Sequence, residues 1–383
     1  MSWVMQGSIR QRSAGSWELR VFVGVDPETK RRRYRSVTVR GSRADAQREL
    51  DVMVASTCSV REVGLRSSMS ELLEAWFAIA STSWAPTTIR QTRSVLKCYL
   101  HPRIGDVAVG DLTPAAIDAM YAALYRGGGM RGQPLSAGTL ARVHVVLRAA
   151  LGQAQRWGWI WDNPAERAHR IVSVAPELTP PTPDEVRVLL DHVHSRDPAL
   201  HTFVVVAAFS GGRRSQLLGL RWRNVDFDHG RLSFCAGWVE GPEGPVLTAT
   251  KTKRRHVVDL DAGSIEVLVD HAQRCRTANA GVLNPDGFVF SDDADGAAAW
   301  KPNRATKAFG RLRADAGLRH FRLHDLRHFM ATQMLEAGVP LPVVSRRLDH
   351  RRVSTTLDRY AHAVPGGDAA AAQTLWRIVQ QAS

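Results

Sequence analysis

Residues 324–328 read HDLRH, and this stretch decides how the C-terminal half of the chain is interpreted. His324 and Arg327 are three residues apart, so on a helix they share one face. A guanidinium keeps its charge at any physiological pH, and an imidazole exchanges a proton near neutrality. His324 alone is more simply read as a core histidine, but that reading does not hold for the whole ordered set of clusters in this half of the chain.

Three further polar clusters surround this stretch in sequence. Residues 209–222 read FSGGRRSQLLGLRW, where a Gly-Gly turn leads into a helix beginning near Arg213 and favours phosphate binding. Residues 348–360 read LDHRRVSTTLDRY and carry His350 and Tyr360. Residues 250–255 read TKTKRR, a polar tip between two expected strands. Its lysines can reach into a nucleic-acid groove, but the pattern alone favours a solvated turn.

Charge and composition point to a folded protein with a polyanionic partner. The chain has 383 residues, of which 44% are hydrophobic and 23% charged, and these values are ordinary for globular proteins. Net charge is +14 and the isoelectric point is about 10.4, as in many nucleic-acid-binding proteins. Most of the 51 basic residues are arginine, which coding bias can also produce, so charge alone does not decide between these readings.

Cysteine usage and hydropathy bound the remaining classes. The four cysteines form no C-x-x-C pair, which argues against a zinc site or a disulfide framework: Cys58, Cys98, Cys235 and Cys275. No metal or cofactor is expected. No apolar run approaches a membrane span, and the first residues lack a signal-peptide core. We expect a soluble, cytoplasmic protein without a membrane partner.

The front of the chain reads as a small basic module over residues 1–62. Residues 1–48 hold eleven Lys/Arg and four Asp/Glu. Strand-like runs at 7–12, 17–23 and 33–39 precede a helix-like stretch at 43–55. Four arginines are placed to contact phosphates or groove edges: Arg31, Arg32, Arg33 and Arg35. The alternative is a solvated edge sheet with no ligand.

The rest divides into a helical and a mixed region. Residues 67–170 carry four amphipathic helical patterns, and a Pro-rich stretch at 176–183 follows as a linker. Residues 177–383 mix helices with strand-like pieces at 231–234, 245–249 and 255–260. The fold class is therefore a multidomain α+β protein. It comprises a small N-terminal β-sheet module, an all-α domain, and a mainly α domain with a small β-sheet.

The four clusters, in this order and spacing over residues 182–365, resemble the catalytic motifs of the tyrosine recombinases, the phage integrase family. The resemblance implies that residues 1–62 bind arm-type DNA, that 67–170 bind the core site, and that 177–383 form the catalytic domain. It also implies that Tyr360 attacks the scissile phosphate to give a 3′-phosphotyrosine. Arg213 and Arg327 would clamp the phosphate, with His350 hydrogen-bonded to it. Lys251 would protonate the leaving 5′-oxygen, and His324 would take the tyrosine proton.

Some residues depart from the family pattern. Gln216 stands where glutamate is usual, Gly212 where a larger apolar residue is usual, and Asp349 where glycine is usual. The lysine hairpin is also short. None of these changes removes a catalytic side chain, but Gln216 cannot offer a carboxylate to neighbouring arginines.

The resemblance implies a metal- and ATP-independent integrase of a phage or integrative element. It would act on double-stranded attachment sites in a bacterial nucleoid, as a tetramer, with a DNA-bending host factor and an excision factor as candidate partners. Lys253 and Arg254 would contact DNA beside Lys251. A chromosome-dimer resolvase and a catalytically silent DNA-binding regulator are the alternatives.

The end of the chain carries one further expectation. Residues 368–383 follow a Pro-Gly-Gly break and read as an amphipathic tail helix. We expect this helix to dock on a neighbouring protomer through Trp376, and the alternative is packing on its own domain. Its apolar face would comprise Ala372, Leu375, Trp376 and Val379.

Overall fold

The computed structural model describes residues 7–25, 31–129, 132–169, 179–249 and 255–361, with four tail positions: 373, 376, 377 and 380. The chain divides into two compact units, residues 1–176 and 177–383. The expected division of the first unit into domains 1–62 and 67–170 stays a prediction. Lys251, Lys253, Arg254 and most of the tail lie outside the described residues.

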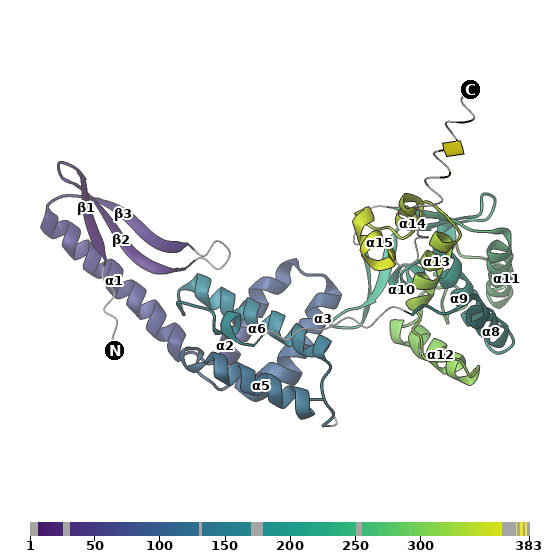
Figure 1. The fold of residues 1–383 in the computed structure, drawn as a ribbon, viewed down its shortest axis with the longest axis horizontal. Coiled ribbons are helices and arrows are strands. Elements are labelled where there is room, and N and C mark those ends of the chain that lie inside the picture. Colours follow the sequence, from purple (N-terminus) through teal and green to yellow (C-terminus); the bar gives the residue numbers. More distant parts are fainter. Residues whose placement is uncertain are drawn as a thin grey trace. The chain divides into compact units, whose positions relative to one another are not determined.

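The first unit begins with the antiparallel sheet that the sequence predicts. Its order is β1 (Ser8–Ser13), β2 (Ser16–Val25) and β3 (Arg32–Arg40), and it lies along a long helix (Figure 1). Alternate residues of a strand point to opposite faces. One face packs against the helix through Leu19 and Val21, which are fully buried with Ala46, Leu50 and Met53 of that helix.

This helix, α1, spans Arg43–Arg66 and is longer than the expected 43–55. Ser42 and Asp45 form a capping box at its start. The expected end at residue 55 was wrong, because the helix continues through the polar residues 56–59. Ser56 and Thr57 donate their hydroxyls to the Met53 carbonyl at 2.9 and 2.8 Å, so polar side chains are accommodated without a break.

The four arginines named from the sequence are exposed but do not share a face. In the β2–β3 register, Leu19 pairs with Val37 on the side facing α1, and Arg20 pairs with Ser36 on the open side. By alternation Arg32 lies on the open face, whereas Arg33 and Arg35 follow the α1 side beyond its apolar contacts. The open face also carries basic residues that the sequence analysis did not single out: Arg10, Arg20 and Arg40.

The remainder of the first unit is helical, as predicted. The helices are α2 (Met69–Ala80), α3 (Pro86–Val95), α4 (His101–Ile104), α5 (Pro114–Gly127), α6 (Ala137–Trp157) and α7 (Pro164–Arg167). A π-helical turn at Leu96–Leu100 joins α3 to α4. Their shared core includes Leu72, Leu73, Ile117, Leu147 and Leu151. The sheet contacts this region through the Phe22 ring, which stacks on Trp161 at 4.8 Å, while the Arg61 guanidinium lies 4.0 Å from the same indole. Phe22 lies on the same face of the sheet as Arg20, so Trp161 covers this end of the open face.

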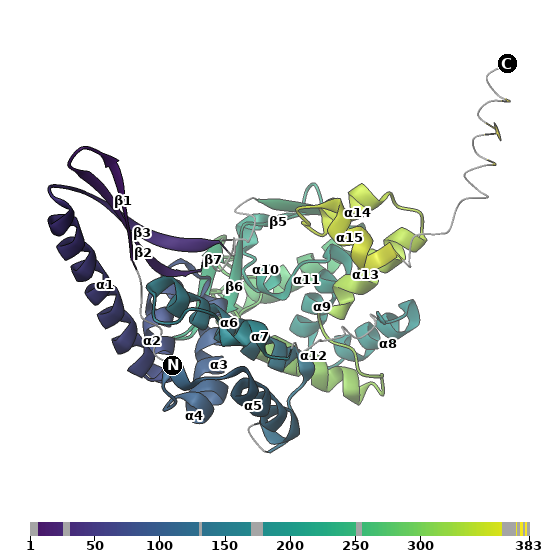
Figure 2. The same cartoon turned by 60° about the vertical axis from the view of Figure 1, so that its left-hand side comes forward.

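The second unit is mainly helical, with a large core and a smaller cluster formed by its last three helices. Its helices are α8 (Pro183–His194), α9 (Pro198–Ser210), α10 (Arg214–Leu218), α11 (Ala262–Ala278), α12 (Pro302–Asp315), α13 (Asp325–Glu336), α14 (Leu341–Arg347) and α15 (Val353–Tyr360). Helix α9 is buried nearly all round, with Phe203, Val204 and Val206 in the core. The last three helices gather together in both views (Figures 1 and 2). That arrangement brings the polar clusters of 324–328 and 348–360 into one region.

The strands of this unit pair differently from the sequence expectation. Strands β4 (Val225–Asp226), β5 (Arg231–Phe234) and β8 (His256–Asp259) form one sheet, while β6 (Ala236–Glu240) pairs with β7 (Pro245–Ala249). The strands on either side of 250–254 therefore belong to different sheets and do not form a hairpin with each other. The sequence analysis missed β6, which turns back at once through Gly241 and Gly244 and takes β7 as its partner.

Candidate active site

The centre of the site is the hydroxyl of Tyr360, the last residue of α15. Tyr360 is only 1% exposed, and its hydroxyl lies 2.6 Å from Nδ1 of His328 on α13. The hydroxyl donates to Nδ1 when the neutral ring carries its proton on Nε2. The sequence analysis did not assign His328 a role, although it is the last residue of the HDLRH stretch.

The environment of this pair fixes its protonation. Burial lowers the pKa of His328 to about 4, with His324 and Arg359 adding to the effect, so the ring is neutral at physiological pH. Burial also raises the pKa of Tyr360, which keeps the phenol protonated, while Arg327 and Arg359 oppose this shift. The site therefore holds a protonated phenol against a neutral ring that can accept its proton.

His324, expected to take the tyrosine proton, lies at the start of α13. The carboxylate of Asp325 accepts the backbone N–H of Arg322 at 2.7 Å and so stabilises the turn that begins the helix. His324 is exposed, and its ring meets His328 edge-on with centroids 5.0 Å apart. Within the described residues it makes no hydrogen bond to Tyr360. His324 thus borders the proton acceptor rather than contacting the hydroxyl.

Arg327 lies in the first turn of α13 and contacts both the 209–222 cluster and the 348–360 cluster. It is 3% exposed and donates to the carbonyls of Gly211, at 2.5 Å, and Leu348. Burial lowers its pKa to about 10, and the charge of Arg213 adds to this. The group still carries its charge at neutral pH, so it offers a fixed cation beside Tyr360.

Arg213 precedes the five-residue helix α10. Its guanidinium contacts the turn at residues 348–349, where Arg327 also binds. Its Nη2 donates to the Asp349 carbonyl at 3.2 Å, and its Nη1 lies 3.0 Å from the Asp349 carboxylate. Gln216 accepts the backbone N–H of Arg213 at 2.9 Å. Helix α10 is short, so the guanidinium rather than the helix end is the main feature of this cluster.

His350 follows the same turn and contacts α15. Its Nδ1 lies 2.8 Å from the hydroxyl of Thr356, which is fully buried. Burial lowers the pKa of His350 to about 4, and Arg327 and Arg213 add to this shift. The structure therefore brings together five of the six expected catalytic residues in one region: Arg213, His324, Arg327, His350 and Tyr360. The sixth, Lys251, lies outside the described residues.

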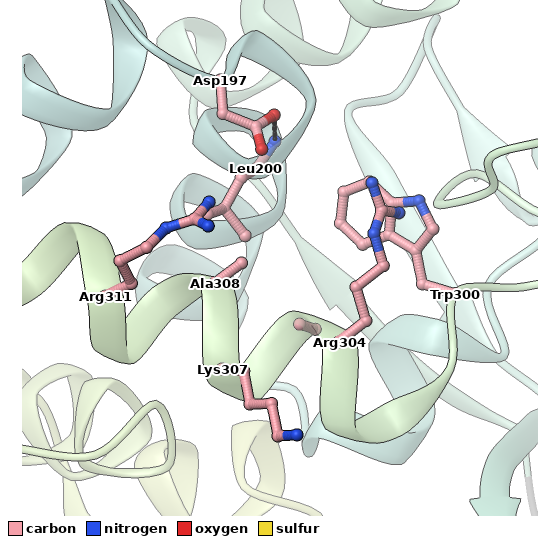
Figure 3. A pocket seen from close by; sticks show the side chains of 8 residues that line it. Asp197, Leu200, Trp300, Arg304, Lys307, Ala308 and Arg311 are labelled. Carbon is pink, nitrogen blue, oxygen red and sulfur yellow. Dashed lines mark hydrogen bonds between the residues drawn. The ribbon is translucent and has the colours of Figure 1, made fainter.

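A separate hollow of about 400 Å³ lies beside α12 and contains none of these residues. Figure 3 shows Arg304 over the ring of Trp300, 4.4 Å from its centroid, and Arg311 extending toward Asp197. Lys307 adds a third cation to the lining. The lining suits anions better than apolar ligands, and it does not include Tyr360.

Two family models match the chain, and one of them covers the region that carries this geometry. Residues 181–365 match the phage integrase family, and residues 68–125 match the N-terminal SAM-like domain of phage integrases. The chain belongs to the phage integrase family. This integrase is therefore a site-specific DNA recombinase of the tyrosine type.

Relatives match over nearly the full chain. The prophage phiRv2 integrase of Mycobacterium tuberculosis is 25% identical over 393 residues, which covers 98% of this chain and 96% of the relative. An integrase of Streptomyces ambofaciens is also 25% identical, covering 90% of this chain and 88% of the relative. A XerC-like tyrosine recombinase of Caldanaerobacter subterraneus is 23% identical and covers 80% and 82%.

Solved structures share the fold. The Tn1549 transposon integrase, in complex with transposon right-end DNA, gives a TM-score of 0.67 at 17% identity. That match covers 80% of this chain and 99% of the other. Lambda integrase, as a tetramer bound to a Holliday junction, gives 0.59 at 17% identity, covering 90% and 96%. No helix among the described residues of this integrase is both long and apolar enough to cross a membrane.

Proposed function

We propose that this integrase joins an attachment site on a phage or integrative element to one on the host chromosome, using Tyr360 as its nucleophile. The observation that carries the proposal is the convergence of Tyr360, His328, Arg327 and Arg213, which come from three separated stretches of sequence. A nucleophile, a proton acceptor and two fixed cations are what cleavage of a phosphodiester needs.

The proposed cleavage forms one bond to phosphorus, breaks another and moves two protons. The Tyr360 oxygen bonds to phosphorus, its proton moves to Nδ1 of His328, and the bond from phosphorus to the 5′-oxygen breaks. Lys251 donates a proton to that 5′-oxygen, leaving a 5′-hydroxyl and a 3′-phosphotyrosine. Rejoining is the reverse reaction with a new 5′-hydroxyl. The covalent link conserves the phosphodiester, so no ATP is consumed.

The cations act where charge develops. Arg213 and Arg327 bind the non-bridging oxygens, since guanidinium groups stabilise a phosphate through paired, charge-assisted hydrogen bonds. Thr356 holds Nδ1 of His350, which leaves Nε2 for the phosphate. Tyr360 is buried in this structure, so the hydroxyl must become accessible before it can attack. We assign that exposure to DNA binding.

The N-terminal sheet provides the second DNA contact in this proposal. Its open face carries Arg10, Arg20, Arg32 and Arg40, and basic residues on a sheet face bind phosphates of a groove. A site bound there, separate from the crossover site, distinguishes an integrase from a chromosome-dimer resolvase, which lacks the basic front module.

Assembly and location complete the proposal. Two strand exchanges on two duplexes need four active sites, so four protomers assemble on DNA in the bacterial cytoplasm, at the nucleoid. Trp376 is 68% exposed, as an anchor for a neighbouring protomer requires. A DNA-bending host factor and an excision factor are proposed partners on the family resemblance alone.

A nicked suicide substrate tests the chemistry. Its cut releases a short fragment, so an active enzyme accumulates covalent protein–DNA adduct. We expect wild-type protein to form the adduct and Tyr360→Phe to bind the same DNA without forming it. Binding without adduct by the wild type would instead support the regulator. Adduct formed by Tyr360→Phe would overturn the assignment of the nucleophile.

A further inference from the structure

Asp349 adopts an unusual backbone conformation at the point where the two arginines meet. It follows Leu348 at the end of α14 with φ of 50°, one of two residues other than glycine with positive φ in the described chain. That conformation costs a side-chain-bearing residue roughly 1 kcal/mol, although aspartate tolerates it better than most. A glycine would avoid this cost, so the carboxylate is expected to contribute something in return.

The carboxylate meets Arg213 directly. Its Oδ2 lies 3.0 Å from Nη1 of Arg213, with the two side chains 15% and 29% exposed. The same residue's carbonyl accepts Nη2 of Arg213 at 3.2 Å. The left-handed backbone thus lets one residue hold the guanidinium by two different groups. Partial burial makes this ion pair less screened than a surface pair.

The carboxylate of Asp349 lies where two cations meet on one turn. Arg327 and Arg213 donate to the adjacent carbonyls of Leu348 and Asp349, so two positive charges anchor on one turn. Asp349 is the one carboxylate in the described chain that forms an ion pair with either of them. Without it, the two guanidiniums would repel each other with no compensating charge.

Gln216 does not fill this role. It is 3% exposed, and its Oε1 accepts the backbone N–H of Arg213 while its Nε2 has no hydrogen-bond partner. The uncharged amide of Gln216 binds the backbone of Arg213. It therefore holds the main chain of Arg213 in place but does not orient its guanidinium. The two tasks are therefore split between residues 216 and 349.

We propose that Asp349 is a positioning residue that orients Arg213 for the scissile phosphate. A guanidinium has five N–H donors. Three are used by the turn at 348–349, and Nε–H and the second Nη1–H have no partner in the part of the chain that the structure describes. Either of these donors remains available for an oxygen of the phosphate. This inference rests on the proposed function, in which Arg213 binds that phosphate.

The test compares Asp349→Asn and Asp349→Gly on the nicked suicide substrate. The asparagine keeps the shape and tolerates the positive φ, whereas the glycine removes both the carboxylate and the backbone strain. At saturating DNA we expect both variants to form adduct about 10- to 100-fold more slowly, the size expected for a misplaced catalytic group. The DNA concentration giving half-maximal rate should stay the same or fall, because a negative charge has been removed.

Chemical rescue supplies the readout that a merely structural role would not move. Formate should restore adduct formation by the glycine variant, whose turn has room for a small carboxylate, and not by the asparagine variant. Chloride at the same ionic strength should have no effect. Asp286→Asn is the matched control, since Asp286 forms an exposed ion pair with Arg223 away from the site. We expect it to cleave at the wild-type rate.

The outcomes separate the two proposals. If Asp349→Asn cleaves as fast as wild type or faster, or formate fails to rescue Asp349→Gly, Asp349 does not position Arg213. Melting curves of both variants check that the unit is folded. If the wild type itself forms no adduct, the proposed function fails and not merely the role of Asp349.

Discussion

Nδ1 of His328 lies 2.6 Å from the hydroxyl of Tyr360, and both residues are buried. This places the phenol's proton beside a ring that is neutral at physiological pH, because burial lowers the pKa of His328 to about 4. The first prediction follows from this contact.

His328→Asn should slow cleavage and change its pH dependence. The asparagine Oδ1 can accept the phenol's hydrogen bond but cannot take its proton, and a general base contributes roughly 10²–10⁴-fold. We expect the single-turnover rate to fall by that order at neutral pH and to rise with pH, as hydroxide replaces the base. The wild-type rate should change much less over the same range. His324→Asn is the comparison, since His324 does not contact the hydroxyl. A larger loss of rate for His324→Asn than for His328→Asn would mean that His324, not His328, accepts the tyrosine proton.

Arg213→Ala and Arg327→Ala should both slow cleavage, but only Arg327→Ala should also destabilise the fold. Losing one transition-state donor costs about 10²–10³-fold in rate, so both variants should form adduct far more slowly. Arg327→Ala also leaves the carbonyl of Gly211 without its donor, and leaves the carbonyl of Leu348 with only the 3.5 Å contact from Arg213. An unsatisfied buried group costs about 1–3 kcal/mol, so this variant should unfold at lower urea concentration. Equal urea midpoints for the two variants would contradict the structural role of Arg327.

Acid should destabilise the catalytic unit before its carboxylates titrate. His328 and His350 have folded pKa values of about 4, below their ordinary value of 6.5. Between these values the unfolded chain binds protons that the folded chain does not, so stability falls as pH falls from about 6.5 to 4. Above 6.5 this contribution is fully present. The free energy of unfolding, measured across this range, should slope less steeply with pH in His328→Asn. An unchanged slope would mean that His328 is not buried as a neutral ring.

The open face of the N-terminal sheet should bind DNA through its arginines. Replacing Arg20 and Arg32 by alanine should weaken binding to the second site and lower the dependence on salt by roughly 0.9 log units per lost phosphate contact. The matched pair is Arg33 and Arg35, which lie on the other face by the strand register. Footprinting on the element's attachment DNA, with all three proteins, compares them. A stronger loss from the matched pair would assign the DNA to the α1 side.

The parts of the fold that follow a strong local period could be predicted from the sequence. The three N-terminal strands and the helices of residues 67–170 are set by the spacing of apolar residues, and they lie where predicted. Most of the site could be placed as well, because short clusters of charged residues mark it. Their geometry could not, since contacts between residues 213, 327 and 349 depend on how distant helices pack.

The failures have physical causes. The expected helix ended at residue 55, whereas α1 continues to Arg66, with the hydroxyls of Ser56 and Thr57 bonded within the helix. The expected pairing of β7 with β8 was wrong because residues 236–240 were not recognised as a strand. Those residues form β6, which pairs with β7. His328 had a signal in the sequence, since His324 and His328 are four residues apart and share a helical face. Only the packing of Tyr360 decides which of them receives the hydroxyl.

The burial of Tyr360 has a consequence for the host genome. A recombinase encounters about 10⁶–10⁹ chance sequences for each proper target. A permanently exposed phenol among arginines could nick any of them. With the hydroxyl 1% exposed and held by His328, a chance encounter leaves the strand intact unless binding also supplies the free energy to free the tyrosine. Burial of the hydroxyl thus makes DNA breakage conditional on recognition of the target site.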